Sequence, residues 1–136
     1  MNLLRFLAAI SITLAGSNSL ALASNIEKLP SGVIVAHIVE GKGASPNANN
    51  TVRVHYRGTL QNGTEFDSSF KRNQPISFPL KNVIPCWTQG VQKMKVGGKA
   101  KLTCPAATGY GARGVPGVIP ANSTLHFEVE LLNIER

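Results

Sequence analysis

The chain has 136 residues and a formal net charge of +7, with 43% hydrophobic and 15% charged residues. This length and composition fit one globular domain and argue against two full domains or an extensively disordered chain. Lysine and arginine never form a run longer than two, so a solvated basic surface is favoured over a nucleic-acid interface.

The first 23 residues have the organisation of a secretory signal peptide. Arg5 precedes an apolar run over residues 6–14, and a small-residue stretch ends in Ala21-Leu22-Ala23. Because the apolar run is too short and too interrupted to span a bilayer, a retained membrane anchor is the less favoured alternative. We therefore expect cleavage near Ala23, export to the periplasm or outside the cell, and no stable membrane insertion.

The rest of the chain divides into a short lead-in over residues 24–32 and one domain over residues 33–136. Export would place the two cysteines, Cys86 and Cys104, in an oxidising compartment, where they can form one disulfide. Two buried free thiols are the alternative. The sequence contains no C-x-x-C motif, so a thioredoxin-like redox site has no support.

Segments that are rich in β-branched residues, or in which apolar residues alternate, predict the strands. They cover residues 33–39, 51–57, 65–70, 76–80, 99–104 and 124–133. The alternation directs Tyr56 toward the core and His55 toward solvent. Gln61-Asn62-Gly63 predicts a hairpin turn, and Pro79 predicts an edge strand or a bulge.

The segment from Val83 to Met94 predicts the one helix of the domain. Pro85 suits a first helical turn, and Gly97 and Gly98 provide a stop signal. Four apolar residues share one helical face: Ile84, Trp87, Val91 and Met94. A lone helix with such a face must pack on a sheet. We therefore predict an α+β fold in which a mostly antiparallel sheet of five or six strands wraps around one short helix.

A loop rich in glycine and proline is predicted over residues 105–121, and a loop of this length in a small domain is usually functional. Gly109 to Gly114 matches G-x-G-x-x-G, but the Val-Pro-Gly-Val-Ile-Pro that follows cannot open a regular helix, so nucleotide binding is disfavoured. The three histidines fall at outward strand positions or strand ends and predict no metal site. No Ser-His-Asp arrangement suggests nucleophilic catalysis.

Six aromatic residues from different segments are predicted to share the inward face: Tyr56, Phe66, Phe78, Trp87, Tyr110 and Phe127. They would form either an ordinary core or an aromatic cavity. Asp67 favours the cavity, because a carboxylate at the mouth of an aromatic pocket marks a site. Strand alternation puts Asp67 on the face opposite Phe66, so this arrangement needs a bulge that turns it.

The order and spacing of several short motifs resemble the FKBP-type peptidyl-prolyl cis–trans isomerases over residues 33–132. The motifs are Val54-His55-Tyr56-Arg57-Gly58, Asn62-Gly63, Phe66-Asp67-Ser68-Ser69, Arg72, Val83-Ile84-Pro85 with Trp87, Gly90-Val91, Met94, Val96-Gly97-Gly98, Tyr110-Gly111, Pro116-Gly117-Val118-Ile119-Pro120, and the alternating Leu125, Phe127, Val129 and Leu131. The resemblance implies the minimal single-domain, exported bacterial form of the family, with a shallow apolar pocket between helix and sheet.

The same resemblance implies roles for individual residues. Trp87 would form the pocket floor, and Asp67 would be the polar group near a bound carbonyl, oriented together with Tyr56 by Arg72. Ile84 would offer a backbone N–H, and Tyr110 a hydroxyl. The expected walls are Tyr56, Phe66, Phe78, Val83, Val118, Ile119 and Phe127, with Ile76 at the rim. Five of these residues are expected to carry catalysis: Tyr56, Asp67, Trp87, Tyr110 and Phe127.

Three positions depart from the family pattern. Cys86 stands where glycine usually precedes the tryptophan, and a bridge from it to Cys104 would pin the helix to the sheet. Ile76 replaces a common phenylalanine, so the pocket rim should be more open on that side. Val115 occupies a variable loop position that influences substrate choice.

The function implied by the resemblance is peptidyl-prolyl cis–trans isomerisation that assists the folding of exported proteins. A dry aromatic pocket would stabilise the twisted Xaa-Pro amide, and neither a cofactor nor a metal is implied. The expected partners are proline-containing polypeptides and macrolide inhibitors, without nucleic acid, and a monomer is expected. The alternative is a peptide-binding chaperone module in which catalysis is incidental.

Overall fold

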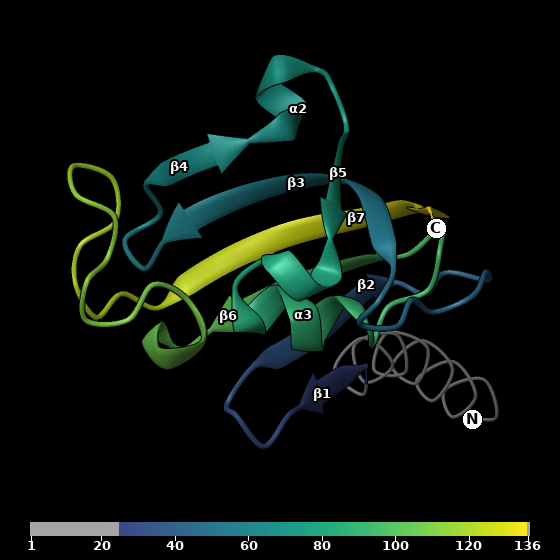
Figure 1. Cartoon of the computed structure of the whole chain (residues 1–136), viewed down its shortest axis with the longest axis horizontal. Helices are drawn as coiled ribbons and strands as arrows, with labels where there is room; N and C mark the ends of the chain where they lie inside the picture. Colours follow the sequence, from purple (N-terminus) through teal and green to yellow (C-terminus); the bar gives the residue numbers. More distant parts are fainter. Residues whose placement is uncertain (1–24, 136) are drawn as a thin grey trace, which may run out of the picture.

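The computed structural model describes residues 25–135 (Figure 1), so the predicted signal peptide lies outside the described residues. The strands are β1 (Ile26–Lys28), β2 (Ile34–Val39), β3 (Thr51–Leu60), β4 (Glu65–Ser68), β5 (Ile76–Pro79), β6 (Lys99–Cys104) and β7 (Leu125–Glu135). The helices are α2 (Ser69–Arg72) and α3 (Pro85–Val91), with short 3₁₀ turns η1 (Leu80–Asn82) and η2 (Ala106–Thr108).

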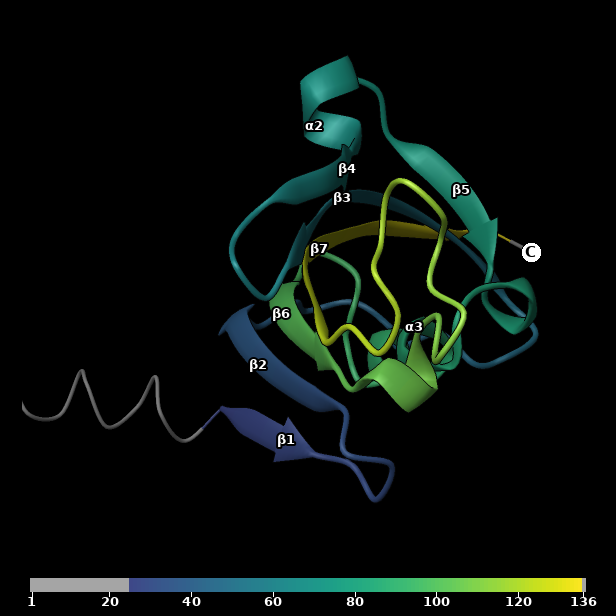
Figure 2. The same cartoon turned by 90° about the vertical axis from the view of Figure 1, so that its left-hand side faces the viewer.

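The strands form one antiparallel sheet in the order β1-β2-β6-β7-β3-β4, and β5 also pairs with β3. The sheet curves around α3, which lies against its concave face (Figure 2). The predicted α+β fold, with an antiparallel sheet around a short helix, is confirmed. Because β5 pairs with β3 alone, Pro79 lies on an edge strand, as its missing N–H requires.

The sheet has one strand that the sequence pattern did not predict. Residues 26–28 lie in the segment expected to be a loose lead-in, but they form β1 and pair with residues 34–36 of β2. Their side chains are all exposed. Three exposed residues carry no alternation of apolar and polar side chains, so only the tertiary pairing with β2 reveals the strand.

Two predicted elements differ from the structure at their ends. The strand expected over residues 65–70 stops at Ser68, whose side chain accepts from the N–H of Lys71 and caps α2. The helix expected to reach Met94 ends at Val91, and tighter turns bring the N–H of Met94 to the Val91 carbonyl. These turns still bury Met94, so the apolar pattern extends beyond the regular helix.

The core lies between α3 and the concave face of the sheet. Trp87, Val91 and Met94 are buried against inward residues of the strands, including Val54 and Leu102. Gly90 allows this close packing, because a Cβ there would lie 3.1 Å from Cδ2 of Leu102. The predicted alternation is confirmed along β3, where the inward side chains are buried and the outward ones are more exposed.

A disulfide joins α3 to the end of β6. Cys86 and Cys104 are bonded, with their Cα atoms 5.6 Å apart, and both side chains are fully buried. Of the two sequence-based alternatives, the structure therefore has the bridge and not two free thiols.

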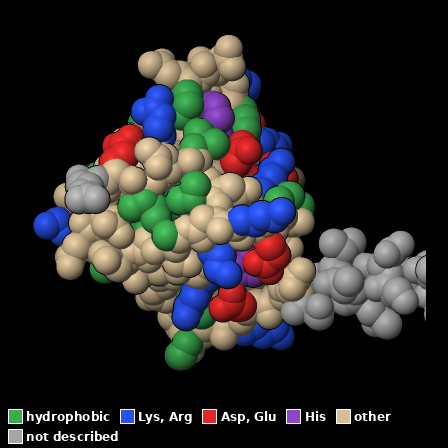
Figure 3. Space-filling view, turned by 90° about the vertical axis from the view of Figure 1, so that its right-hand side faces the viewer, with side chains coloured by type: hydrophobic (Ala, Val, Ile, Leu, Met, Phe, Trp, Pro, Cys, Tyr) green, Lys and Arg blue, Asp and Glu red, His purple; other side chains and the backbone are tan. Residues whose placement is uncertain are grey.

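The surface carries both signs of charge. On the side of the molecule seen in Figure 3, Lys and Arg side chains alternate with Asp and Glu rather than forming one broad basic region. Within residues 25–135, no helix is both long enough and apolar enough to cross a membrane.

Candidate functional site

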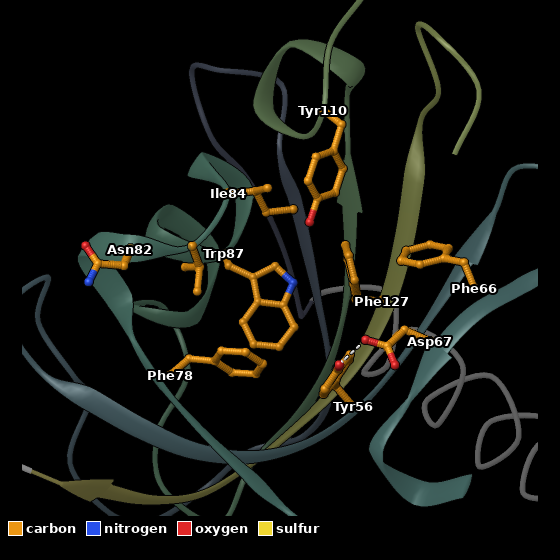
Figure 4. A pocket seen from close by; sticks show the side chains of 10 residues that line it. Tyr56, Phe66, Asp67, Phe78, Asn82, Ile84, Trp87, Tyr110 and Phe127 are labelled. Carbon is orange, nitrogen blue, oxygen red and sulfur yellow. Dashed lines mark hydrogen bonds between the residues drawn. The ribbon is translucent and has the colours of Figure 1, made fainter. Parts of the chain in front are cut away.

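A pocket of about 460 Å³ opens between α3, the sheet and the long loop that follows β6. Its lining comes from eight parts of the chain (Figure 4): Tyr56 in β3, Phe66 and Asp67 in β4, Phe78 in β5, Asn82 in η1, Val83 and Ile84 before α3, Trp87 in α3, Tyr110 in the loop and Phe127 in β7. All six predicted aromatic residues therefore meet at one cavity.

Trp87 forms the centre of the pocket wall. Its ring centroid lies 5.4 Å from that of Tyr56, 5.4 Å from that of Phe78 and 5.5 Å from that of Phe127, each nearly perpendicular to it. Edge-to-face contacts of this kind add to the stability that burial of the rings provides. The arrangement is therefore a rigid apolar surface with one open side.

A β-bulge explains how Phe66 and Asp67 both reach the pocket. In the pairing of β4 with β3, Glu65 faces Thr59 and Asp67 faces Gly58, so Phe66 is the extra residue. The bulge turns two consecutive side chains toward one cavity, as the sequence analysis required. Gly58 leaves room for the rings, because a Cβ there would lie 2.6 Å from Cζ of Phe66 and 2.9 Å from Cε1 of Phe127.

Asp67 is the one ionisable carboxylate in the pocket lining. One of its oxygens accepts from the Tyr56 hydroxyl in a short hydrogen bond, and the other accepts from Nη1 of Arg72 at 2.7 Å and from the N–H of Ser68 at 2.9 Å. Figure 4 shows the bond from Tyr56 as a dashed line. The carboxylate is therefore held on both sides.

These contacts set the charge states of the group. Burial alone would raise the pKa of Asp67, but the hydrogen bonds from Tyr56 and Arg72 outweigh it and hold the pKa below its usual value. Burial, together with the hydrogen bond to Asp67, raises the pKa of Tyr56 above 10.0. At neutral pH, Asp67 is thus an ionised acceptor and Tyr56 a neutral donor, and neither is poised for proton transfer.

The loop over residues 105–121 is held by its own backbone. Val115 and Ile119 exchange two hydrogen bonds of 2.8 Å, and the N–H of Gly114 donates to the carbonyl of Tyr110 at 3.0 Å. Gly114 has φ +62, and a Cβ there would lie 2.3 Å from the Ile119 carbonyl oxygen, so the turn requires glycine. Tyr110 projects from this loop, and its hydroxyl points into the pocket (Figure 4).

Nine of the ten lining residues were predicted from the sequence, and four predicted residues lie outside the lining. Arg72 lies behind the lining and donates to Asp67. Ile76 lies two residues before Phe78 on β5, and Phe78 takes the place beside Trp87. Val118 and Ile119 line a separate surface hollow with Leu60.

Asn82 is the lining residue that the sequence analysis missed. It is an exposed polar residue in η1, one position before Val83. Nothing in its type or spacing distinguishes it from any other surface asparagine, and only its place at the start of the α3 segment brings it to the rim.

The fold and the site define a class of protein: a sheet-and-helix domain with a preformed aromatic pocket for an apolar ligand and fixed polar groups at its edge. Comparison with known families gives a match to the FKBP-type peptidyl-prolyl cis-trans isomerase model over residues 42–132. The chain therefore belongs to the FKBP-type peptidyl-prolyl cis-trans isomerase family.

Individual relatives support this assignment. The chain is 46% identical over 115 residues to the isomerase FkpA of Escherichia coli K12, covering 85% of this chain and 42% of FkpA. It is 55% identical over 106 residues to FK506-binding protein 1 of Dictyostelium discoideum, covering 76% of this chain and 99% of that protein.

Solved structures agree. The crystal structure of E. coli FkpA matches with a TM-score of 0.78 and 38% identity, over 98% of this chain and 70% of that one. A peptidyl-prolyl isomerase from Pseudomonas syringae matches with a TM-score of 0.77 and 32% identity, over 89% and 92% of the two chains. In the sequence comparison, the matched region covers less than half of the length of FkpA but nearly the whole of the Dictyostelium relative.

Proposed function

We propose that the processed protein is a peptidyl-prolyl cis–trans isomerase that acts on proline-containing polypeptides. The observation that carries this proposal is the pocket itself. Rings from β3, β5 and β7 surround Trp87 of α3, the ring of Phe66 in β4 packs on Phe127, and Asp67 is held at the edge. The family assignment and the match to whole-length relatives support it.

The proposed mechanism needs no covalent step. Rotation about a Xaa-Pro bond has a barrier of about 20 kcal/mol, because the amide loses its resonance in the twisted form. An apolar pocket removes water from the carbonyl, and donors fixed in place stabilise the twisted amide more than the planar one. Tyr110 would donate its hydroxyl to the peptide. Ile84 is the N-cap of α3, where a backbone N–H has no intrahelical acceptor, and would donate to it as well.

In this mechanism Asp67 is an electrostatic and orienting group. Its pKa lies below the usual value, so it stays ionised and keeps the Tyr56 hydroxyl and the Arg72 guanidinium in fixed positions. The proline and its neighbour would contact the apolar lining, which consists of Tyr56, Phe66, Phe78, Val83, Trp87 and Phe127. The same pocket would accept macrolides, since the Dictyostelium relative is named as an FK506-binding protein.

We further propose that the protein is exported as a monomer and assists the folding of exported proteins. The arrangement of residues 1–23 supports cleavage near Ala23, and the disulfide is of a kind that persists in oxidising compartments. Mass spectrometry of the secreted or periplasmic protein should give a chain that begins near Ser24. A full-length mass in the exported fraction would contradict this part of the proposal.

The deciding experiment is a protease-coupled isomerase assay on the processed protein, with a Xaa-Pro test peptide and with or without a macrolide inhibitor. We expect acceleration of the cis-to-trans conversion and its loss with the inhibitor. If circular dichroism shows that the protein is folded and it still gives no acceleration, the proposed isomerase activity is contradicted. If peptides still quenched the fluorescence of Trp87, the single tryptophan, the alternative of a peptide-binding chaperone module would be favoured.

A further inference from the structure

The ladder of hydrogen bonds along β3 has a gap beside the pocket. On the side of β3 away from β7, β5 pairs with residues 51–54 and β4 pairs with residues 57–59. His55 and Tyr56 fall between these two partners and have no strand opposite them on that side. The chain leaves β4 for α2 at this point, and the gap follows from that departure (Figure 1).

The hydroxyl of Ser69 fills the gap. Ser69 is the first residue of α2 and is completely buried. Its Oγ accepts from the backbone N–H of Tyr56 at 2.7 Å and lies 3.3 Å from the Tyr56 carbonyl oxygen, to which it can donate. In a strand the N–H and C=O of one residue point to the same side, so one hydroxyl can reach both of the backbone groups that a missing strand would have paired.

A third contact offers the hydroxyl proton a second acceptor. The same Oγ lies 2.9 Å from Nδ1 of His55, on the outer face of the sheet. Since the N–H of Tyr56 already occupies an acceptor position of the oxygen, its single proton is free to go to His55 Nδ1 or to the Tyr56 carbonyl. His55 in turn stacks on Phe70 of α2, with the ring centroids 4.7 Å apart, so the contact ties α2 to the back of β3.

Ser69 also sets the far end of α2. Its carbonyl accepts from the N–H groups of Asn73 and Gln74, which end the helix. Arg72, the last residue of α2, donates to Asp67, and Asp67 accepts from the Tyr56 hydroxyl. Ser69 thus holds both elements that supply partners to Asp67: the backbone of β3 at Tyr56 and the short helix that carries Arg72.

We propose that Ser69 is a positioning residue for the pocket, whose hydroxyl aligns the Tyr56 hydroxyl, the Asp67 carboxylate and the Arg72 guanidinium for their work on the bound peptide. Its contribution to turnover rests on the proposed isomerase function. Its effect on Tyr56 does not, and can be measured in the protein without substrate.

The spectroscopic test uses the small number of tyrosines. The chain has two, Tyr56 and Tyr110, so in a Tyr110→Phe background the absorbance of tyrosinate reports Tyr56 alone. Burial and Asp67 hold the pKa of Tyr56 above its ordinary value. In Ser69→Ala, the phenol should loosen from Asp67 and the ionisation of Tyr56 should move down toward 10.0, with circular dichroism recorded at each pH to follow the fold.

Ser77→Ala is the matched control. Ser77 lies on β5 opposite Arg53, and its hydroxyl donates to Glu135 at 3.1 Å and not to Tyr56. This substitution removes a serine hydroxyl, as Ser69→Ala does, and should leave the Tyr56 titration and turnover unchanged. Ser69→Thr keeps the hydroxyl and should recover most of the parent behaviour. If Ser69→Ala does not fold, Ser69→Cys, whose thiol is a weaker donor and acceptor than the hydroxyl, is measured in its place.

In the isomerase assay, Ser69→Ala should lower kcat/KM roughly tenfold, the order expected when a buried backbone group loses its hydrogen-bond partner. The affinity for a proline peptide, followed by Trp87 fluorescence, should change much less. An unchanged Tyr56 titration in Ser69→Ala would overturn the proposal. Equal losses of kcat/KM in Ser69→Ala and Ser77→Ala, in proportion to their losses of thermal stability, would overturn it as well. If the parent protein has no isomerase activity, the proposed function fails, while the titration still decides the role of Ser69.

Discussion

Asp67 owes its charge state to neighbours that lie on other elements. Tyr56 approaches from β3 and Arg72 from α2, and their hydrogen bonds lower a pKa that burial alone would raise. The guanidinium is in turn held protonated, since the hydrogen bond to Asp67 raises the pKa of Arg72. The pocket therefore contains a fixed anion and a fixed neutral phenol over a wide range of pH.

The first prediction concerns pH. The folded pKa of Asp67 is lowered, so its stabilising effect is present above the unfolded value of roughly 4 and is lost as pH falls through the folded pKa. The folded pKa of Tyr56 is raised, so its effect is present below roughly 10 and is lost as pH rises through the folded pKa. Chemical unfolding from pH 5 to 9 should therefore show no step from either group. A step near neutral pH that disappears in Asp67→Asn would contradict this.

The second prediction concerns the polar groups of the pocket. Asp67→Ala and Tyr110→Phe should each lower kcat/KM, roughly tenfold for a group that interacts directly with the twisted amide or its donors. Both variants should keep the fold, because the side chain of Asp67 is 40% exposed and Tyr110 loses only a hydroxyl. Arg53→Ala, on the outer face of β3, serves as control. Unaltered rates in both variants would show that the site lies elsewhere.

Some residues of the site could be predicted from the sequence and others could not. Alternation along β3 and β7 fixes the direction of Tyr56 and Phe127, because the side chains of a strand alternate strictly. Alternation fails at Phe66, since a bulge depends on how two strands pair and not on either strand alone. Asn82 could not be found, because its position depends on where η1 packs.

At the scale of elements, α3 carries the strongest sequence signal and the disulfide secures it. The apolar face around Trp87 predicts a helix, but the regular helix has only seven residues. Isolated helices of this length are unstable in water, so α3 depends on its packing and on the bond from Cys86 to Cys104. The proline at its start supplies no hydrogen bond, and no side chain caps it.

The third prediction follows from this dependence. The double variant Cys86→Ala/Cys104→Val removes the bridge while keeping the buried positions apolar. We expect the free energy of unfolding to fall by about 3 kcal/mol, the usual value for a loop of this size. Urea unfolding followed by circular dichroism measures the change, and mass spectrometry of the parent protein should show two hydrogens missing. A parent protein with two free thiols, or a double variant of equal stability, would contradict the structure's bridge.

Two elements escaped the sequence analysis for the same physical reason. α2 has four residues and β1 has three, too few for any periodic pattern to show. Each exists because of contacts made elsewhere: α2 is capped by Ser68 and anchored by Ser69, and β1 is paired with β2. The longer strands were predicted because their repeated alternation encodes a buried face.

At the scale of the whole molecule, the described residues share one buried cluster that includes α3 and strands β2, β3, β6 and β7. Pocket and core are therefore continuous, and Trp87 belongs to both. The resemblance of ordered motifs over residues 33–132 was the strongest guide to this arrangement, because periodicity alone cannot bring distant rings together.

The fourth prediction is that the domain unfolds as one unit. Since the pocket shares its residues with the core, Trp87 fluorescence, which reports the pocket, and far-ultraviolet circular dichroism, which reports the sheet, should give the same urea midpoint. The processed protein is the sample, and the two signals are recorded on the same solutions. A fluorescence transition at clearly lower urea would mean that the pocket opens independently of the sheet.

The loop that bears Tyr110 is closed upon itself by the paired Val115 and Ile119 and by the turn at Gly114. This side of the pocket is therefore preformed before a peptide binds. Because the loop is already ordered, it should lose little conformational entropy when a peptide binds, and the entropic cost of binding from this loop should be small.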